Sequence, residues 1–137
     1  MKKLVVWVLL SLLLAGCNVE NKDKENMRIQ DYLITLGYED ESDSNVTKLS
    51  YSITIAQIGN NEVLEEDIQV VASNWLDQRK INSEVTEFTK EDGDNYIKGF
   101  ITFGTVGYSK QELAANEPFI IGVNVNMNEE SVLLEIN

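Results

Sequence analysis

The chain has 137 residues, a hydrophobic content of 43%, 8 glycines and 1 proline, which excludes collagen-like, low-complexity and largely disordered classes. It has no histidine and only one cysteine, which excludes Ser-His-Asp and Cys-His catalysis, the common zinc sites and an internal disulfide. The formal net charge is −12, and it becomes −14 if a leader containing Lys2 and Lys3 is removed. Such a surface repels phosphate backbones and anionic lipids, so we expect no nucleic-acid partner. We assign the charge to solubility, with a specific basic partner or a cation as the alternative.

The first 16 residues predict a removable export signal. Lys2 and Lys3 give a positive start, residues 4–14 are apolar apart from Ser11, and the small residues Ala15 and Gly16 follow. This run is well short of the roughly 20 apolar residues that a transmembrane helix needs. We therefore expect the segment to be cleaved rather than to remain as a membrane span.

The motif Leu14-Ala15-Gly16-Cys17 resembles the lipobox of bacterial lipoproteins. In that family the cysteine is acylated and becomes the mature N-terminus, which implies that Cys17 is the lipidation site and carries fatty acids such as palmitate. The alternative is an ordinary signal with an accidental cysteine, which leaves a free exported thiol. The resemblance implies a protein anchored by lipid to the outer face of a bacterial cell membrane. The usage of Lys, Asn, Glu and Ile favours a Gram-positive over a Gram-negative envelope.

Residues 18–30 have few apolar side chains and mixed charges, which predicts a solvated tether. We therefore divide the chain into a signal peptide at 1–16, the lipidated cysteine and tether at 17–30, and a single domain at 31–137.

Two stretches near the start of this domain alternate apolar and polar residues, at 32–38 and at 49–56. A period of two predicts strands with one face toward a core. The acidic segment 39–45 between them predicts a turn. The second strand has the clearer pattern, with Leu49, Tyr51, Ile53 and Ile55 on one side.

Further along, residues 58–62 predict a hairpin connection, and residues 68–72 and 85–89 are rich in β-forming residues. A helical turn is expected at 75–79 and a tight turn at 91–95. The stretch 96–106 predicts a strand in which Gly99 and Gly104 mark bulges or bends.

Near the end, Ser109 and Glu112 have the spacing of a capping box, which predicts a short helix to about Ala115. Pro118 prevents its continuation. Residues 119–127 and 132–136 then alternate again and predict two paired strands.

Six or seven short strands without long amphipathic helices predict an all-β fold, an antiparallel two-sheet sandwich of immunoglobulin-like type with one short helix near 110–115. A partly open barrel is the alternative. The order of features from Tyr51 to Val125, including GYSKQEL and EPFIIGV, resembles small extracytoplasmic proteins of low-GC Gram-positive bacteria with no established activity. The resemblance implies fold and location only.

No residue pattern indicates an enzyme, because catalysis would depend on carboxylates alone and chance pairs are expected among 23 acids. No catalytic residue, cofactor or metal is predicted. The acidic loops 39–45 and 92–95 offer oxygen ligands for calcium, but neither matches the EF-hand register, so we interpret both as solvated turns. Trp75 and the tyrosines at 32, 38, 51, 96 and 108 are interpreted as packing residues first, with an exposed contact surface as the alternative.

The leading hypothesis is a non-enzymatic binding or adaptor module that recognises another envelope protein or a ligand through loops or a sheet edge. The alternative is a passive structural or accessory subunit of a membrane complex. A contiguous apolar patch or an unprotected edge strand favours recognition, and an evenly charged surface favours the passive subunit.

Overall fold

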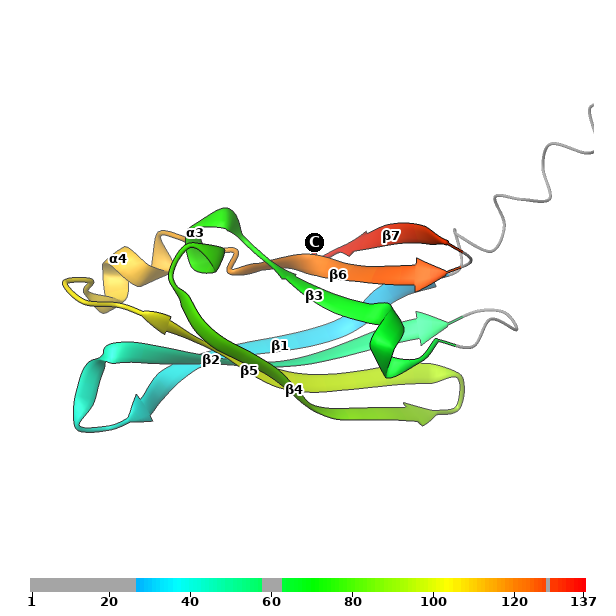
Figure 1. Ribbon diagram of the computed structural model, residues 1–137, viewed down its shortest axis with the longest axis horizontal. Coiled ribbons are helices and arrows are strands. Elements are labelled where there is room, and N and C mark those ends of the chain that lie inside the picture. The colour runs from blue at the N-terminus through cyan, green and yellow to red at the C-terminus, as the bar shows by residue number, and fades with distance from the viewer. Residues whose placement is uncertain (1–26, 58–62, 128) are drawn as a thin grey trace, which may run out of the picture.

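A computed structural model describes residues 27–57, 63–127 and 129–137 (Figure 1). These residues form seven strands and short helical segments. The strands are β1 Met27–Asp40, β2 Asp43–Gln57, β3 Ile68–Ala72, β4 Lys80–Glu91, β5 Asp94–Gly104, β6 Ile120–Met127 and β7 Glu130–Glu135. The helical segments are the 3-10 turn η1 Glu65–Asp67, α3 Asn74–Asp77 and α4 Lys110–Ala114.

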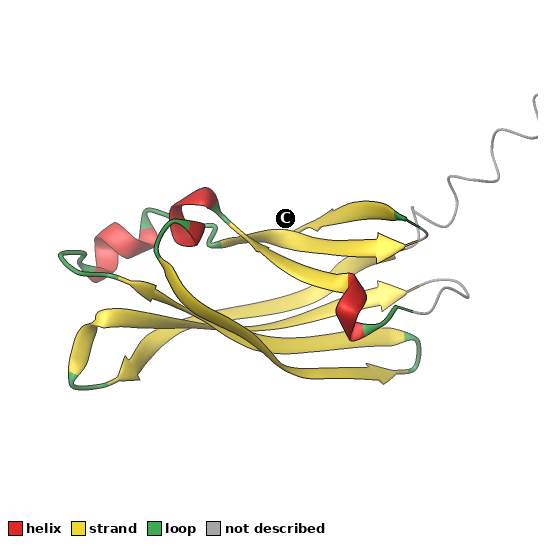
Figure 2. Cartoon of the chain, viewed as in Figure 1, coloured by secondary structure: helices red, strands yellow, loops and turns green. Residues whose placement is uncertain are grey.

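The strands form two antiparallel sheets that lie as two layers (Figure 2). One sheet has four strands in the order β1-β2-β5-β4, and the other has three in the order β3-β6-β7. This is the strand order of the constant-type immunoglobulin sandwich, in which the first, second, fifth and fourth strands form one sheet. The predicted all-β, two-sheet sandwich is confirmed.

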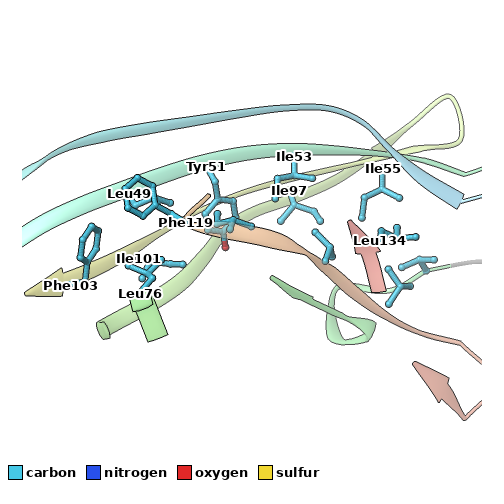
Figure 3. Packing of buried hydrophobic residues seen from close by; sticks show 14 of the residues in the cluster. Leu49, Tyr51, Ile53, Ile55, Leu76, Ile97, Ile101, Phe103, Phe119 and Leu134 are labelled. Atoms are coloured by element: carbon cyan, nitrogen blue, oxygen red, sulfur yellow. The ribbon is translucent and has the colours of Figure 1, made fainter. Parts of the chain in front are cut away.

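The core lies between the sheets and is made by the alternating residues of each strand. Ile53 of β2 is directly paired with Ile97 of β5, and both side chains are fully enclosed (Figure 3). Since paired residues of antiparallel strands point to the same face, this alternation places one apolar side of each strand inside. The most enclosed hydrophobic side chains are Leu49, Ile53, Ile55, Val63, Leu76, Ile97, Phe103, Ile120, Val123 and Val125.

The domain begins earlier than the predicted boundary at residue 31. Strand β1 starts at Met27, whose side chain is buried in the core cluster, and Ile29 packs against the same cluster. Residues 27–30 therefore belong to the sandwich, because their apolar side chains find partners across the sheets that a local reading of composition does not reveal.

Strand β1 is a long edge strand with one strand neighbour, β2. Its register with β2 shifts twice, between Ile29 and Asp31 and between Tyr38 and Asp40. Such shifts mark β-bulges, which bend an edge and end regular pairing. Between them the strand is regular.

The predicted short helix is confirmed as α4. The Ser109 hydroxyl accepts from the backbone N–H of Glu112, and the Glu112 carboxylate accepts from the backbone N–H of Ser109, at 3.2 and 2.7 Å. The helical turn expected at 75–79 is also present as α3, capped by Ser73.

Two local predictions differ from the structure. Residues 58–62 lie outside the described residues, but the strands on either side, β2 and β3, belong to different sheets, so this connection is not a hairpin. The bulges predicted at Gly99 and Gly104 lie instead in the facing strand β4, at register shifts between Lys80 and Asn82 and between Val85 and Glu87. Gly99 has a different role, because a Cβ atom there would overlap the ring of Tyr51.

Candidate functional site

The inner face of β1 is apolar but incompletely covered. Tyr32, Ile34 and Leu36 pair with the core residues Ile53, Tyr51 and Leu49 of β2 and therefore point to the core side of the sheet. Nevertheless Tyr32 is 42% exposed and Leu36 is 41% exposed. The three-stranded sheet thus leaves this outer strand of the four-stranded sheet partly open.

The opening forms a groove of about 590 Å³, which we call the β1 groove. Its lining residues are Tyr32, Leu33, Ile34, Leu36, Glu117, Pro118, Phe119, Ile120 and Ile136. Leu33 pairs with Ser52 and lies on the opposite face of β1 from Ile34, and it is 64% exposed. The groove therefore extends around the free edge of β1 and offers both apolar side chains and the unpaired side of a strand.

Acidic groups border this groove. Glu117 is among its lining residues, Asp31 begins the regular part of β1, and Asp40 lies just beyond the end of that part. Hydrogen bonds from the Ser42 hydroxyl and backbone N–H keep the pKa of Asp40 below its usual value, so this carboxylate is charged at neutral pH. No lysine or arginine is among the lining residues.

The opposite side of the sandwich has a second groove of about 450 Å³, the β4 groove, between the edge strands β3 and β4. Its walls mix apolar and polar side chains, and Ser83 of β4 faces the core side where β1 has Tyr32 and Leu36. Asp77 and Lys80 at its rim form an ion pair at 3.1 Å. The β4 groove thus has mixed walls and an ion pair at its rim, whereas no lysine or arginine lines the β1 groove.

The floor of the β4 groove holds Tyr51, which is buried in the core. Burial raises the pKa of its phenol to about 12. Tyr51 lines the β4 groove, and Figure 3 shows its oxygen pointing from β2 into the interior. The side chain therefore contributes packing and not an ionised group at neutral pH.

Trp75 lies at the end of the sandwich that carries α3 and α4 (Figure 1). Its ring contacts Phe103, Phe119 and Tyr108 with centroid distances of 5.9, 6.1 and 5.5 Å. The Arg79 guanidinium lies 4.4 Å from its ring centroid and donates hydrogen bonds to the Trp75 carbonyl and the Tyr108 hydroxyl. These contacts agree with the packing interpretation of Trp75.

The other predicted site residues are separated. Cys17, with the signal and most of the tether, lies outside the described residues. Asp40 and Asp43 of the loop interpreted as a turn accept hydrogen bonds from Ser42 and Asn45, at 2.9 Å in each case. In the part of the chain that the structure describes, no three His, Cys, Asp or Glu side chains gather as a metal site.

The tyrosines divide between the two interpretations. Tyr32 and Tyr38 are 42% and 44% exposed on β1, whereas Tyr51 is buried and Tyr108 contacts Arg79. The sequence contains a signal for the exposed pair, because residues 32–38 combine bulky apolar side chains with no charge. Their exposure depends on how far the second sheet reaches, which the local pattern does not specify.

Comparisons with known proteins gave no match to a family model, to a curated protein or to a solved structure. None of the described helices is long and apolar enough to cross a membrane. The function is therefore inferred from the grooves and from the sequence motifs.

Proposed function

We propose that this protein is a lipid-anchored recognition module on the outer face of a bacterial membrane, more consistent with a Gram-positive envelope, and that it is not an enzyme. The lipobox Leu14-Ala15-Gly16-Cys17 supports the anchor. The β1 groove supports recognition, because partly exposed apolar side chains beside a free strand edge are typical of protein-binding surfaces.

The alternative, a passive accessory subunit, predicts an evenly charged surface. The observation that favours recognition is the contrast between the two edges of the four-stranded sheet. Ser83 occupies an inward position on β4, whereas Tyr32 and Leu36 occupy inward positions on β1. An edge that only contacts water gains nothing from two exposed bulky apolar side chains, which cost solubility.

Site-specific photocrosslinking in cells tests this function. A photoreactive phenylalanine analogue at Leu36 is expected to give a discrete crosslinked species in the membrane fraction. The same analogue at Thr89, which is exposed on β4 away from the groove, serves as the control. Equal crosslinking from both positions, or none from Leu36, contradicts a recognition role for the β1 groove.

A further inference from the structure

We propose that the partner of the β1 groove is an extended peptide segment of another protein, which adds as a strand to the free edge of β1 and carries basic side chains among apolar ones. This inference rests on the proposed function and names the chemistry of the partner. Three observations carry it: the free edge, the apolar surface beside it and the acidic border.

The free edge determines the shape of the partner. Strand β1 has a neighbour on one side only, and the stretch from Tyr32 to Tyr38 contains no charged residue or proline. Native proteins usually protect exposed edges with lysine, proline or bulges inside the exposed run. An unprotected run presents backbone N–H and C=O groups to an incoming strand, which is the β-augmentation mode of peptide recognition.

The apolar surface determines that every second side chain of the partner is apolar. A strand beside β1 has one face toward the core side of the sheet, where Pro118, Phe119 and Ile136 form the far wall of the groove. Side chains at every second position of the partner therefore meet Tyr32, Leu36 and this wall. Apolar side chains there bury the exposed parts of Tyr32 and Leu36, at about 25 cal/mol per Å² of apolar area removed from water.

The acidic border determines the charge of the partner. Glu117 lines the groove, and Asp31 and Asp40 lie near the two ends of the edge. Lysine or arginine side chains on the incoming strand complement these carboxylates, whereas a second copy of this chain brings another net charge of −12. The charge therefore favours a different, basic protein over self-association.

Two synthetic probes test this inference on residues 18–137, which include the whole described sandwich. One is an eight-residue peptide that alternates valine and lysine, and the other alternates valine and glutamate; both carry a fluorophore for anisotropy measurements. The lysine peptide is expected to bind and the glutamate peptide is not. Raising the ionic strength from about 0.05 M to about 0.5 M is expected to weaken binding, because exposed charge pairs are screened.

Matched variants separate the groove from general attraction between charges. Leu36→Asp puts a charge in the groove, and binding of the lysine peptide is expected to fall about tenfold or more. Thr35→Asp adds the same charge one residue away on the opposite face, where it leaves binding unchanged or stronger. Asp31→Asn, on the outward face where the lysines of the peptide lie, is expected to weaken binding several-fold. Circular dichroism establishes that each variant is folded.

Several results overturn the inference. They are binding of the lysine peptide to Leu36→Asp as tightly as to the wild type, equal binding of the two peptides, no binding of the lysine peptide, and a crosslinked species whose mass is that of a dimer of this chain. A crosslink from Leu36 to a different protein, without lysine-peptide binding, rejects the partner chemistry and retains the proposed function. Lysine-peptide binding without any crosslink in cells rejects the proposed function.

Discussion

The ring of Tyr51 passes directly over Gly99 on the neighbouring strand β5. The two residues are paired in register, and a Cβ atom on Gly99 would overlap both the Tyr51 phenol and the backbone carbonyl oxygen of Glu84 on β4. The glycine thus provides the space through which a buried tyrosine on β2 crosses β5 to reach the β4 groove.

We therefore expect Gly99→Ala to destabilise the domain by about 1–3 kcal/mol, the usual cost of overpacking a core. Urea unfolding of residues 18–137 measures the change. Gly104→Ala is the matched control, since the space around that glycine is empty within 4 Å. Equal effects of the two substitutions contradict the role assigned to Gly99.

Tyr51 predicts a specific loss of stability in alkaline solution. Burial raises the pKa of its phenol from 10.0 to about 12. Between these values the unfolded chain has lost the phenolic proton while the folded chain retains it, so a rise in pH favours unfolding. The contribution of Tyr51 to stability is complete below pH 10 and is lost as the pH rises toward 12.

Tyr51→Phe removes this part of the pH dependence. At neutral pH the variant is expected to be as stable as the wild type or more stable by up to about 1 kcal/mol, because the substitution removes a desolvated hydroxyl and keeps the packed ring. Urea unfolding at pH 7 and at about pH 11 compares the two proteins. A large loss of stability at neutral pH contradicts this account.

The two faces of β2 predict opposite responses to the same charge. Ile53→Asp places an unpaired carboxylate in the centre of the core and is expected to cost several kcal/mol, enough to unfold the domain. Thr54→Asp lies on the outward face and is expected to cost about 1 kcal/mol or less.

Part of the stability lost in Thr54→Asp comes from repulsion between like charges. Asp31 of β1 is directly opposite Thr54, so the new carboxylate faces a like charge. Added salt should therefore recover some of the stability of Thr54→Asp and none of that of Ile53→Asp. Thermal melting followed by circular dichroism measures both variants, and equal damage from the two substitutions contradicts the assignment of faces.

We expect that replacing Arg79 by lysine lowers the stability of the domain. Its guanidinium bonds the Trp75 carbonyl at 2.8 Å and the Tyr108 hydroxyl at 3.1 Å while stacking on the Trp75 ring. A lysine ammonium cannot make these planar contacts together, so Arg79→Lys should cost about 1–2 kcal/mol.

Fluorescence reports this change directly. Residues 18–137 contain a single tryptophan, Trp75, since Trp7 lies in the predicted signal. Arg79→Lys should alter the emission of the folded state and lower the urea midpoint. Lys98→Ala, which breaks an exposed ion pair with Glu87, is the control and should change stability by less than about 1 kcal/mol. A wild-type emission spectrum and midpoint in Arg79→Lys contradict the prediction.

The anchor gives a prediction that is independent of the fold. Cys17→Ser should leave the protein without lipid and move it from the membrane fraction to the soluble or unprocessed fraction. Metabolic labelling with a fatty acid, followed by fractionation, measures both effects. A mature, labelled variant in the membrane fraction contradicts the lipobox assignment.

The sequence predicts the core strands well and the edges poorly, and the reason is physical. Strand β2 has a clear period of two because one of its faces is buried from Thr47 to Ile55. Strand β4 was expected only at 85–89, but it covers Lys80–Glu91, since most of its side chains are exposed and leave no apolar pattern. The β propensity of residues and the alternation of apolar and polar residues both reflect burial, and the side chains of an edge strand are little buried.

The β1 groove also shows what a local sequence pattern can and cannot predict about an edge strand. The alternation in residues 32–38 correctly places Tyr32, Ile34 and Leu36 on one face. That face is left partly open because the second sheet has three strands against four. The number of strands in each sheet follows from long-range pairing, which no local window contains.

The two register shifts between β1 and β2 set a length as well as a bend. Regular pairing extends from Asp31 to Tyr38, and the register shifts on both sides interrupt it. At about 3.3 Å per residue this stretch is roughly 26 Å long. A strand laid along it keeps its hydrogen-bond spacing for about eight residues and then meets backbone that turns away. We therefore expect the proposed partner strand to pair regularly with β1 over about eight residues, and the register shifts to prevent open-ended growth of the sheet.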